Sequence, residues 1–394
     1  MPKLVENTSA DVVIVGGGII GASCAYSLSK DGLRVAVLER HGLASGASSA
    51  CQGGVGFGLS TRGYDLRLRL AAIAAYENLV TEGLDVEFRQ DGILYVGEPR
   101  QEETLKAHVR VFQGMGIECE WLDEKALRNE EPAISPSISG AAVVKKCSNV
   151  YPMRVVVELI RRAYQLGARI YTETELTGIE MMHGKASAAL TPGGKIATDK
   201  IIIAAGAWSR HVGRFVGLDV PVWPLKGHIL VTEPVPRMLR HFVSDTRYED
   251  TVDSMLEVEV GADGPVPGPP QLAAVLHPLD SGHILLGSSR EFASFDRDVV
   301  RERIAAIARL TQQLVPGIAQ LRILRTYAGL RPWTPDGLPL IGPTQQAEGI
   351  IFATGHAGDG NTLAIVTGNL IADLLSGRET TVETGPISPD RFVM

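Results

Sequence analysis

The sequence predicts an α/β protein in which a doubly wound, mostly parallel sheet is joined to a smaller α+β unit built on a mostly antiparallel sheet. Three observations predict this fold. Residues 11–40 have the pattern of a strand, a glycine turn, a helix and a second strand. Residues 152–172 and 200–208 have the patterns of a further helix and two further buried strands. Residues 221–290, in contrast, contain the alternating runs of antiparallel strands.

The first unit carries the glycine spacing G-x-G-x-x-G. The apolar run Val12–Val15 is followed by Gly16, Gly18 and Gly21. We expect the first glycine to permit a sharp turn, the second to let a pyrophosphate approach the backbone, and the third to let the helix lie close to the sheet. Glu39 follows the second strand, 18 residues after Gly21, where its carboxylate suits a ribose hydroxyl and would repel a 2′-phosphate. The unit therefore predicts a Rossmann-like dinucleotide site, with an ordinary βαβ unit as the alternative.

Composition narrows the class of protein. The 394 residues are 45% hydrophobic and 21% charged, which predicts a globular chain of two or three domains. A net charge of −7 without a basic run argues against nucleic acid as a partner. The four cysteines have no metal-ligand or disulfide spacing, so no metal site is predicted; they are Cys24, Cys51, Cys119 and Cys147.

The sequence also indicates where in the cell the protein is expected. Residues 1–11 lack the apolar core of a signal peptide, and no run approaches the roughly 18 apolar residues that span a bilayer. We therefore expect a cytoplasmic protein without a transmembrane segment, while peripheral membrane association stays open.

Segments of different amino-acid composition alternate along the chain. The small-residue stretch 42–63 directly follows the dinucleotide unit, which favours a loop held against a flat partner over a flexible linker. A helix is expected at 64–82. Residues 245–270 are acidic and then rich in Pro and Gly, which predicts a long exposed insertion, either a mobile loop or a docking surface. The predicted dinucleotide-binding domain is discontinuous and comprises residues 1–85, 150–215 and 325–394. The second domain comprises the residues between them, 86–149 and 216–324.

Three further stretches carry a resemblance to a known family. They are AAGAWS at 204–209, YAGLRPWTPDGLPLIGP at 327–343 and FATGHAGDGNTLAIVTGNLIADLLSG at 352–377. Together with the first unit they resemble the D-amino-acid-oxidase-like flavoenzymes. That group includes glycine oxidase, sarcosine oxidase β subunits, D-amino acid dehydrogenases, and D-hydroxyproline and opine dehydrogenase subunits. The resemblance implies that the dinucleotide is FAD, bound by three separate parts of the chain; a single NAD-binding fold is the alternative cofactor reading.

The resemblance also implies which residues contact the cofactor. Asn361 and Thr362 resemble donors to the flavin carbonyls at a helix N-terminus, although the same pair serves as a helix cap. The full implied set is Gly16, Gly18, Ile19, Ile20, Gly21, Glu39, Arg40, Ser45, Ser48, Ser49, Gly53, Gly54, Ala205, Gly206, Trp208, Gly329, Arg331, Gly355, His356, Gly358, Gly360, Asn361 and Thr362.

A smaller set is implied for the substrate. Arg331 matches the position of a carboxylate-binding arginine, and its planar fork of donors suits a carboxylate; a salt bridge is the alternative reading. Tyr248 and Tyr327 are candidate pocket lids, and His356 completes the implied catalytic set. Gly358 is a departure, because some relatives have an arginine there. No arginine stands near Leu279 either, so we expect a small or cyclic substrate held by few charges.

The expected activity is FAD-dependent oxidation of the C–N bond of a small amino or imino acid. Sarcosine, glycine, D-proline and D-hydroxyproline-like compounds are all admissible; the α-hydrogen would move to the flavin as hydride, and water would hydrolyse the resulting imine. One alternative is a flavoprotein subunit of a heteromeric dehydrogenase that passes electrons to an iron–sulfur or second-flavin partner, with residues 245–263 as a docking face. The other is a non-catalytic flavin-binding assembly protein.

Overall fold

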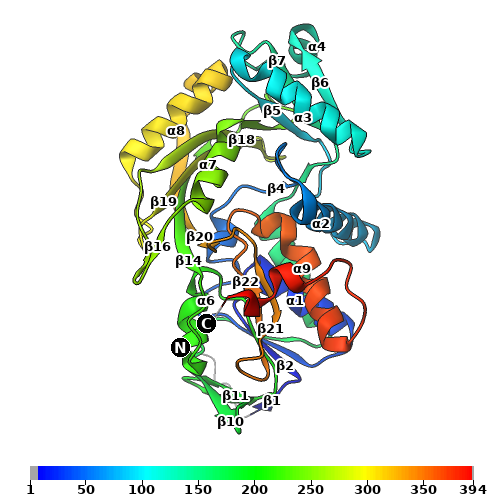
Figure 1. Ribbon diagram of the computed structural model, residues 1–394, viewed down its shortest axis with the longest axis vertical. Helices are drawn as coiled ribbons and strands as arrows, with labels where there is room; N and C mark the ends of the chain where they lie inside the picture. The colour runs from blue at the N-terminus through cyan, green and yellow to red at the C-terminus, as the bar shows by residue number, and fades with distance from the viewer. Residues whose placement is uncertain (1–7, 393–394) are drawn as a thin grey trace.

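The computed structural model describes residues 8–392, and two large sheets dominate it (Figure 1). The lower part of the view holds a six-stranded sheet flanked by helices α1 and α9, and the upper part holds most of an eight-stranded sheet. This mixed α/β arrangement confirms the predicted fold class.

The six-stranded sheet is parallel except for one edge strand. Its apolar runs are buried on both faces: one face packs against helices, and the other packs mainly against apolar residues of the segment 176–196. From edge to edge its strands are β21 (Leu340–Pro343), β22 (Ile350–Thr354), β13 (Ile201–Ile203), β2 (Val12–Val15), β3 (Val35–Leu38) and β9 (Arg169–Tyr171). Only β21 runs antiparallel to its neighbour. Strands from three distant parts of the chain thus lie side by side, as the discontinuous domain requires.

The eight-stranded sheet is antiparallel except for the parallel pair β15 and β5. In order its strands are β20 (Ile323–Trp333), β14 (Trp223–Thr232), β19 (Ile284–Phe292), β18 (Gln271–Pro278), β15 (Phe242–Asp245), β5 (Ile93–Val96), β7 (Gly140–Val144) and β6 (Cys119–Asp123). Strand β20 carries one of the family-like motifs, yet it pairs with β14 in this sheet. The predicted domain boundaries stay a prediction.

Helices cover both sheets. Helix α1 packs against α5 and α9, α2 packs against α9, and α8 packs against β14, β18 and β19. The bounds are α1 (Ile19–Lys30), α2 (Gly63–Thr81), α3 (Glu102–Gly114), α4 (Glu124–Glu130), α5 (Pro152–Gln165), α6 (Ser209–Gly213), α7 (Arg247–Leu256), α8 (Arg301–Leu314) and α9 (Gly360–Ser376). Within the described part of the chain, none of these helices has the length and apolar character needed to cross a bilayer.

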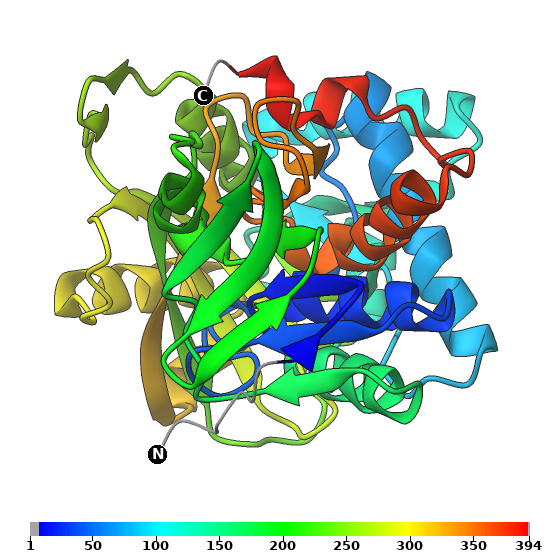
Figure 2. The ribbon, with the colours of Figure 1, turned by 90° about the horizontal axis from the view of Figure 1, so that it is seen from below.

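Three small sheets complete the fold. The four-stranded one lies across the near side of the molecule when it is seen from below (Figure 2). Its strands are β1 (Thr8–Ser9), β12 (Gly194–Ala197), β11 (Lys185–Thr191) and β10 (Gly178–Met182). The two-stranded sheets are β4 (Gly54–Val55) with β8 (Ser148–Asn149), and β16 (Val260–Gly261) with β17 (Gly264–Pro265).

The prediction that residues 245–270 form a long exposed insertion is wrong for residues 245–256, whereas most of residues 257–270 are exposed as expected. Asp245 is the buried last residue of β15, and Arg247–Leu256 form helix α7. Thr251 and Met255 of this helix are buried, because α7 packs against β18. The insertion therefore supplies part of the wall between the two large sheets.

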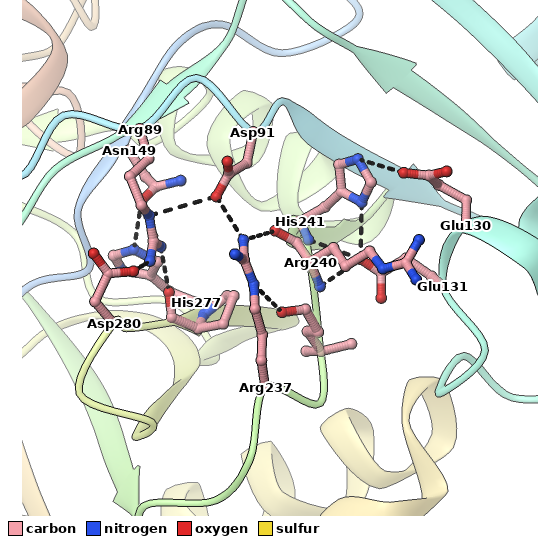
Figure 3. Close-up of polar contacts among 12 residues, drawn as sticks. Arg89, Asp91, Glu130, Glu131, Asn149, Arg237, Arg240, His241, His277 and Asp280 are labelled. Atoms are coloured by element: carbon pink, nitrogen blue, oxygen red, sulfur yellow. Dashed lines mark hydrogen bonds and ion pairs between the residues drawn. The ribbon is translucent and has the colours of Figure 1, made fainter.

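A polar network ties the loops at one edge of the eight-stranded sheet together (Figure 3). Arg89 donates to Asn149 Oδ1 from Nε at 3.1 Å and from Nη2 at 2.8 Å. The same Oδ1 lies 3.4 Å from Nε2 of His277. On the other side of the network, buried Glu131 accepts from the backbone N–H of His241 at 2.7 Å and lies 2.8 Å from its Nδ1. These contacts fix the position of His277, which reaches the loop at 42–63.

Candidate active site

A cavity of about 900 Å³ lies between the two large sheets. It follows the carboxyl ends of parallel strands β2, β3, β13 and β22, where ligands of doubly wound sheets bind. Most of the predicted site residues line it: Gly16, Gly18, Ile19, Ile20, Glu39, Arg40, Ser45, Ser48, Gly54, Ala205, Gly206, Trp208, Tyr248, Gly329, Arg331, His356, Gly358, Gly360, Asn361 and Thr362.

Five predicted residues do not line the cavity: Gly21, Ser49, Gly53, Gly355 and Tyr327. The glycines lie behind the wall and support it. A Cβ at Gly21 would lie 1.9 Å from the oxygen of Gly16, and one at Gly53 would lie 1.8 Å from the oxygen of Val150. Tyr327 stands four residues before Arg331 on β20 and is half-buried outside the lining, so its predicted role as a lid has no support in the geometry.

The glycine turn and the N-terminus of α1 fit a pyrophosphate. The first turn of a helix leaves backbone N–H groups without intrahelical acceptors, and this end of α1 faces the cavity. Ser48 Oγ accepts from the N–H of Ile19 at 2.9 Å, which leaves its hydroxyl proton free to donate into the cavity. Glu39 accepts from the N–H of Gly17 at 2.8 Å, so its carboxylate is held at the cavity edge.

Replacing Gly16 with Ala should reduce FAD binding. Gly16 has φ of +115°, and an added Cβ would lie 2.4 Å from the oxygen of Ala204. We expect the strained backbone alone to cost about 1–3 kcal/mol of stability, and the clash to move the turn away from the pyrophosphate. The measurement is the ratio of flavin to protein absorbance after purification. Gly32→Ala is the matched control: Gly32 also has positive φ, at +82°, but its Cβ would meet nothing within 4 Å, so this variant should retain its flavin.

The small-residue loop is fastened to helix α9. Thr362 Oγ1 accepts from the N–H of Gly56 at 3.1 Å, and Asn361 Nδ2 donates to the oxygen of Gln52. Tyr76 of α2 donates to the oxygen of Asn361 at 2.7 Å. The loop is thus held against the N-terminal end of α9, and both predicted flavin donors are positioned by it.

Two buried histidines are neutral, and their partners define their tautomers. His277 Nδ1 accepts from the N–H of Gly53 at 3.1 Å, so its proton is on Nε2 and faces Asn149. His356 Nε2 lies 2.9 Å from Thr367 Oγ1, which itself donates to the oxygen of Leu363 at 2.7 Å. His356 therefore donates from Nε2, and its buried Nδ1 is left without a partner among the described residues. Burial lowers the pKa of each ring to about 3.

The lowered pKa of His277 predicts acid sensitivity. The pKa of His277 is 6.5 in the unfolded chain and about 3 in the folded chain. Between these two pH values the histidine is protonated in the unfolded chain and neutral in the folded chain. Stability is therefore lost as pH falls below about 6.5, with a slope of about 1.4 kcal/mol per pH unit for each such histidine. His277→Asn, whose amide oxygen can still accept from Gly53, should reduce this slope at pH 5 by about that amount. Urea unfolding at pH 5, 6 and 7 measures it, and His183→Asn on the exposed surface should leave the slope unchanged.

Arg331 reaches the cavity across a neighbouring strand. Its Nη1 donates to the oxygen of Ser289 at 3.0 Å, and its guanidinium lies over Gly227 of β14, where a Cβ would be 2.1 Å from Nη1. Burial and then the nearby Arg290 lower the pKa of Arg331 to about 10. It forms no ion pair within the described residues, so the salt-bridge reading of Arg331 is not supported.

Arg290 is a site residue that the sequence analysis missed. It lies on β19 and is only 4% exposed. Its Nη1 donates to Thr251 Oγ1 at 2.6 Å, and its guanidinium lies 4.4 Å from the centre of the Tyr248 ring. The expectation of few charges around the substrate is therefore wrong: a second guanidinium enters from the strand beside β18 rather than from the region of Leu279. The available signal was a charged residue that directly follows the apolar and small residues ILLGSS at 284–289.

A second missed feature is an ion pair at the start of α9. Arg69 of α2 binds both oxygens of Asp359, at 2.7 and 2.9 Å, and donates from Nε to Asp65 at 2.8 Å. Both Arg69 and Asp359 line the cavity. Because 290 residues separate them, no local pattern indicates the pair. Within the described residues no group of histidine, cysteine and carboxylate side chains is arranged to hold a metal ion.

Comparisons with known proteins agree with this geometry. The family model described as FAD dependent oxidoreductase matches residues 11–374. A glycine oxidase from Geobacillus kaustophilus is 30% identical over 97% of both chains, and the hydrogen cyanide synthase subunit HcnC from Pseudomonas aeruginosa is 30% identical over 98% of this chain and 97% of that one. The crystal structure of glycine oxidase from G. kaustophilus superposes with a TM-score of 0.85 at 28% identity, covering 98% of this chain and 100% of the other. The chain belongs to the D-amino-acid-oxidase-like family of FAD-dependent oxidoreductases.

Proposed function

We propose that this enzyme oxidises the C–N bond of a small amino or imino acid whose carboxylate is bound by Arg331. The observation that carries this proposal is a buried guanidinium that faces the cavity without a carboxylate partner among the described residues. A buried charge of this kind is costly unless an anion pairs with it. The similarity to glycine oxidases, over nearly the whole chain, supports an amine beside that carboxylate.

The residues of the chain bind and orient the substrate, and bound FAD supplies an acceptor for two electrons. The substrate loses one hydrogen from carbon and one from nitrogen, which leaves a C=N bond, and water then hydrolyses this imine to a carbonyl compound and an amine. Arg331 would fix the carboxylate, so that the reacting carbon is held in one orientation. His356 is neutral, because burial lowers the pKa of its ring to about 3, so it adds no charge to the cavity wall.

Anaerobic spectroscopy tests the proposal. The purified holoenzyme is mixed with glycine, sarcosine, D-proline, D-hydroxyproline and dicarboxylic amines, and the flavin absorbance is followed. Loss of the oxidised flavin band with at least one of them is the expected result. Admission of air then separates an oxidase, in which the colour returns rapidly, from a dehydrogenase. An oxidised flavin that no candidate amine reduces would contradict the proposal.

A heteromeric dehydrogenase subunit is the second candidate, because the similar protein HcnC is named as a subunit of hydrogen cyanide synthase. In that case substrate would reduce the flavin, but air would restore the colour slowly and a partner would restore it quickly. Purification of the chain from its native source with an iron–sulfur or flavin-containing partner would favour this candidate over a free-standing oxidase.

A further inference from the structure

Two guanidiniums, not one, face the inner end of the cavity. Arg331 on β20 and Arg290 on β19 come from the two strands that pair with β14, and the absence of a side chain at Gly227 gives the guanidinium of Arg331 room. The register pairs Lys226 with Glu291 on one side and with Leu330 on the other. Side chains alternate along strands, so both arginines are directed to the same face of the sheet.

The two guanidiniums are anchored separately. Arg331 donates to the oxygen of Ser289, whereas Arg290 donates to Thr251 of α7 and lies against the ring of Tyr248. Each therefore keeps further N–H donors for a ligand, because a guanidinium has five. Two guanidinium groups that are held by separate partners suit two anionic groups better than one anionic group shared between them.

Asp359 interacts electrostatically with both arginines, but the carboxylates near this pair are hydrogen-bonded to other groups. Asp359 is bound through both oxygens by Arg69, and Glu249 accepts from the backbone N–H groups of Leu59 and Ser60. Neither Arg290 nor Arg331 forms an ion pair among the residues that the structure describes. A carboxylate placed at each guanidinium would accept from donors that have no acceptor among the described residues.

The cavity also has space beside Arg290. A Cβ at Gly358 would lie 3.6 Å from the Tyr248 hydroxyl and 3.7 Å from Arg290 Nη2, so nothing at position 358 occupies the region between them. A larger side chain there would fill this space. The glycine therefore leaves a subsite whose polar walls are a phenol and a guanidinium.

We propose that Arg290 binds a second carboxylate, and that the preferred substrate is a small dicarboxylic amino or imino acid. This inference rests on the proposed function, because it adds a specificity determinant to the same site. With iminodiacetate, for example, loss of two electrons and two protons to FAD would give the imine, and hydrolysis would release glycine and glyoxylate. Arg331 would hold the carboxylate beside the oxidised carbon, and Arg290 would hold the other.

Matched substrate pairs test this inference in the holoenzyme. Iminodiacetate is compared with its monoamide, and D- and L-aspartate with the corresponding asparagines, by the rate of anaerobic flavin reduction divided by the Kd. We expect the dicarboxylate of at least one pair to be favoured by about 30-fold or more, the factor that corresponds to a buried charge pair. Arg290→Met should bring that ratio close to one. Thr251→Val, which removes the hydrogen bond from Arg290 and the one that Thr251 donates to the oxygen of Tyr248, should lower it by a smaller factor.

Arg325→Met is the matched control, because Arg325 is an exposed arginine on the same strand as Arg331; its ratio should equal that of the unmodified enzyme. A ratio near one in the unmodified enzyme, while glycine or sarcosine still reduces the flavin, would overturn the second-carboxylate inference and leave the proposed function intact. A ratio that Arg290→Met does not change would also overturn it. Failure of every amine to reduce the flavin would instead contradict the proposed function itself.

Discussion

Replacing Arg331 with Met is expected to raise the substrate Kd by about 30- to 1,000-fold, which corresponds to about 2–4 kcal/mol, the usual range for truncating one partner of a buried charge pair. FAD should remain bound, because the turn at Gly16, the loop at 42–63 and the start of α9 hold their positions without this side chain. The measurement is anaerobic titration of the flavin absorbance with the amine that reduces the enzyme. Arg331→Lys should recover little of the loss, since a point charge cannot bind a carboxylate through two parallel donors.

A second variant separates the position of Arg331 from its charge. Gly227→Ala keeps the guanidinium but places a Cβ 2.1 Å from its Nη1, so the side chain must move. We expect the same direction of change with a smaller factor. Arg325→Met, which removes an exposed arginine from the same strand, should alter the Kd less than about twofold. Normal substrate binding by Arg331→Met would exclude this residue from the site.

The glycine turn and its surroundings were predictable because their signals are local. Gly16, Gly18 and Gly21 stand between a β-branched run and a mostly buried helix, and close backbone contacts at Gly16 and Gly21 exclude a side chain there. Glu39 follows from the same spacing. The glycine turn and Glu39 could therefore be placed at the cavity from the sequence, whereas the contacts with FAD that the resemblance implies stay a prediction.

The substrate end was less predictable because it depends on register and long-range packing. Arg290 enters the site only because β19 pairs with β14 in a register that places it near Gly227, and the sequence does not contain that register. Helix α7 was missed because the Pro- and Gly-rich residues that follow it dominate the composition of the stretch 245–270. Its burial against β18 is a property of the tertiary structure.

Hydrogen-bond partners distinguish the residues that support the cavity from the residues that are available to a substrate. The cofactor end is built from backbone N–H groups, small side chains and neutral histidines, whose partners lie within the chain. The substrate end contains arginines whose remaining donors have no acceptor within the described residues. Groups that are satisfied internally stabilise the cavity, and groups that are left unsatisfied indicate what enters it.

Arg69 supports the cavity through partners within the chain, and its replacement should have the largest effect on the free energy of unfolding. Arg69→Met leaves Asp359 without its bidentate partner at the N-terminus of α9, and it also frees Asp65. Breaking a fully buried ion pair from one side costs about 3–5 kcal/mol. The side chains of Arg69 and Asp359 are 13% and 31% exposed, so solvent screening should reduce this cost to about 1–3 kcal/mol. We expect a loss of that size in the free energy of unfolding of the apoprotein, measured in urea, together with weaker retention of FAD.

Two further variants test the cause of this loss. Arg67→Met removes an exposed arginine from the same helix and should change stability by less than about 0.5 kcal/mol. The double variant Arg69→Met with Asp359→Asn removes both charges, so it should be more stable than Arg69→Met alone. If the two single effects simply add, the cost does not come from an uncompensated carboxylate. In that case Arg69 would act through the packing of its side chain between α2 and α9 rather than through its charge.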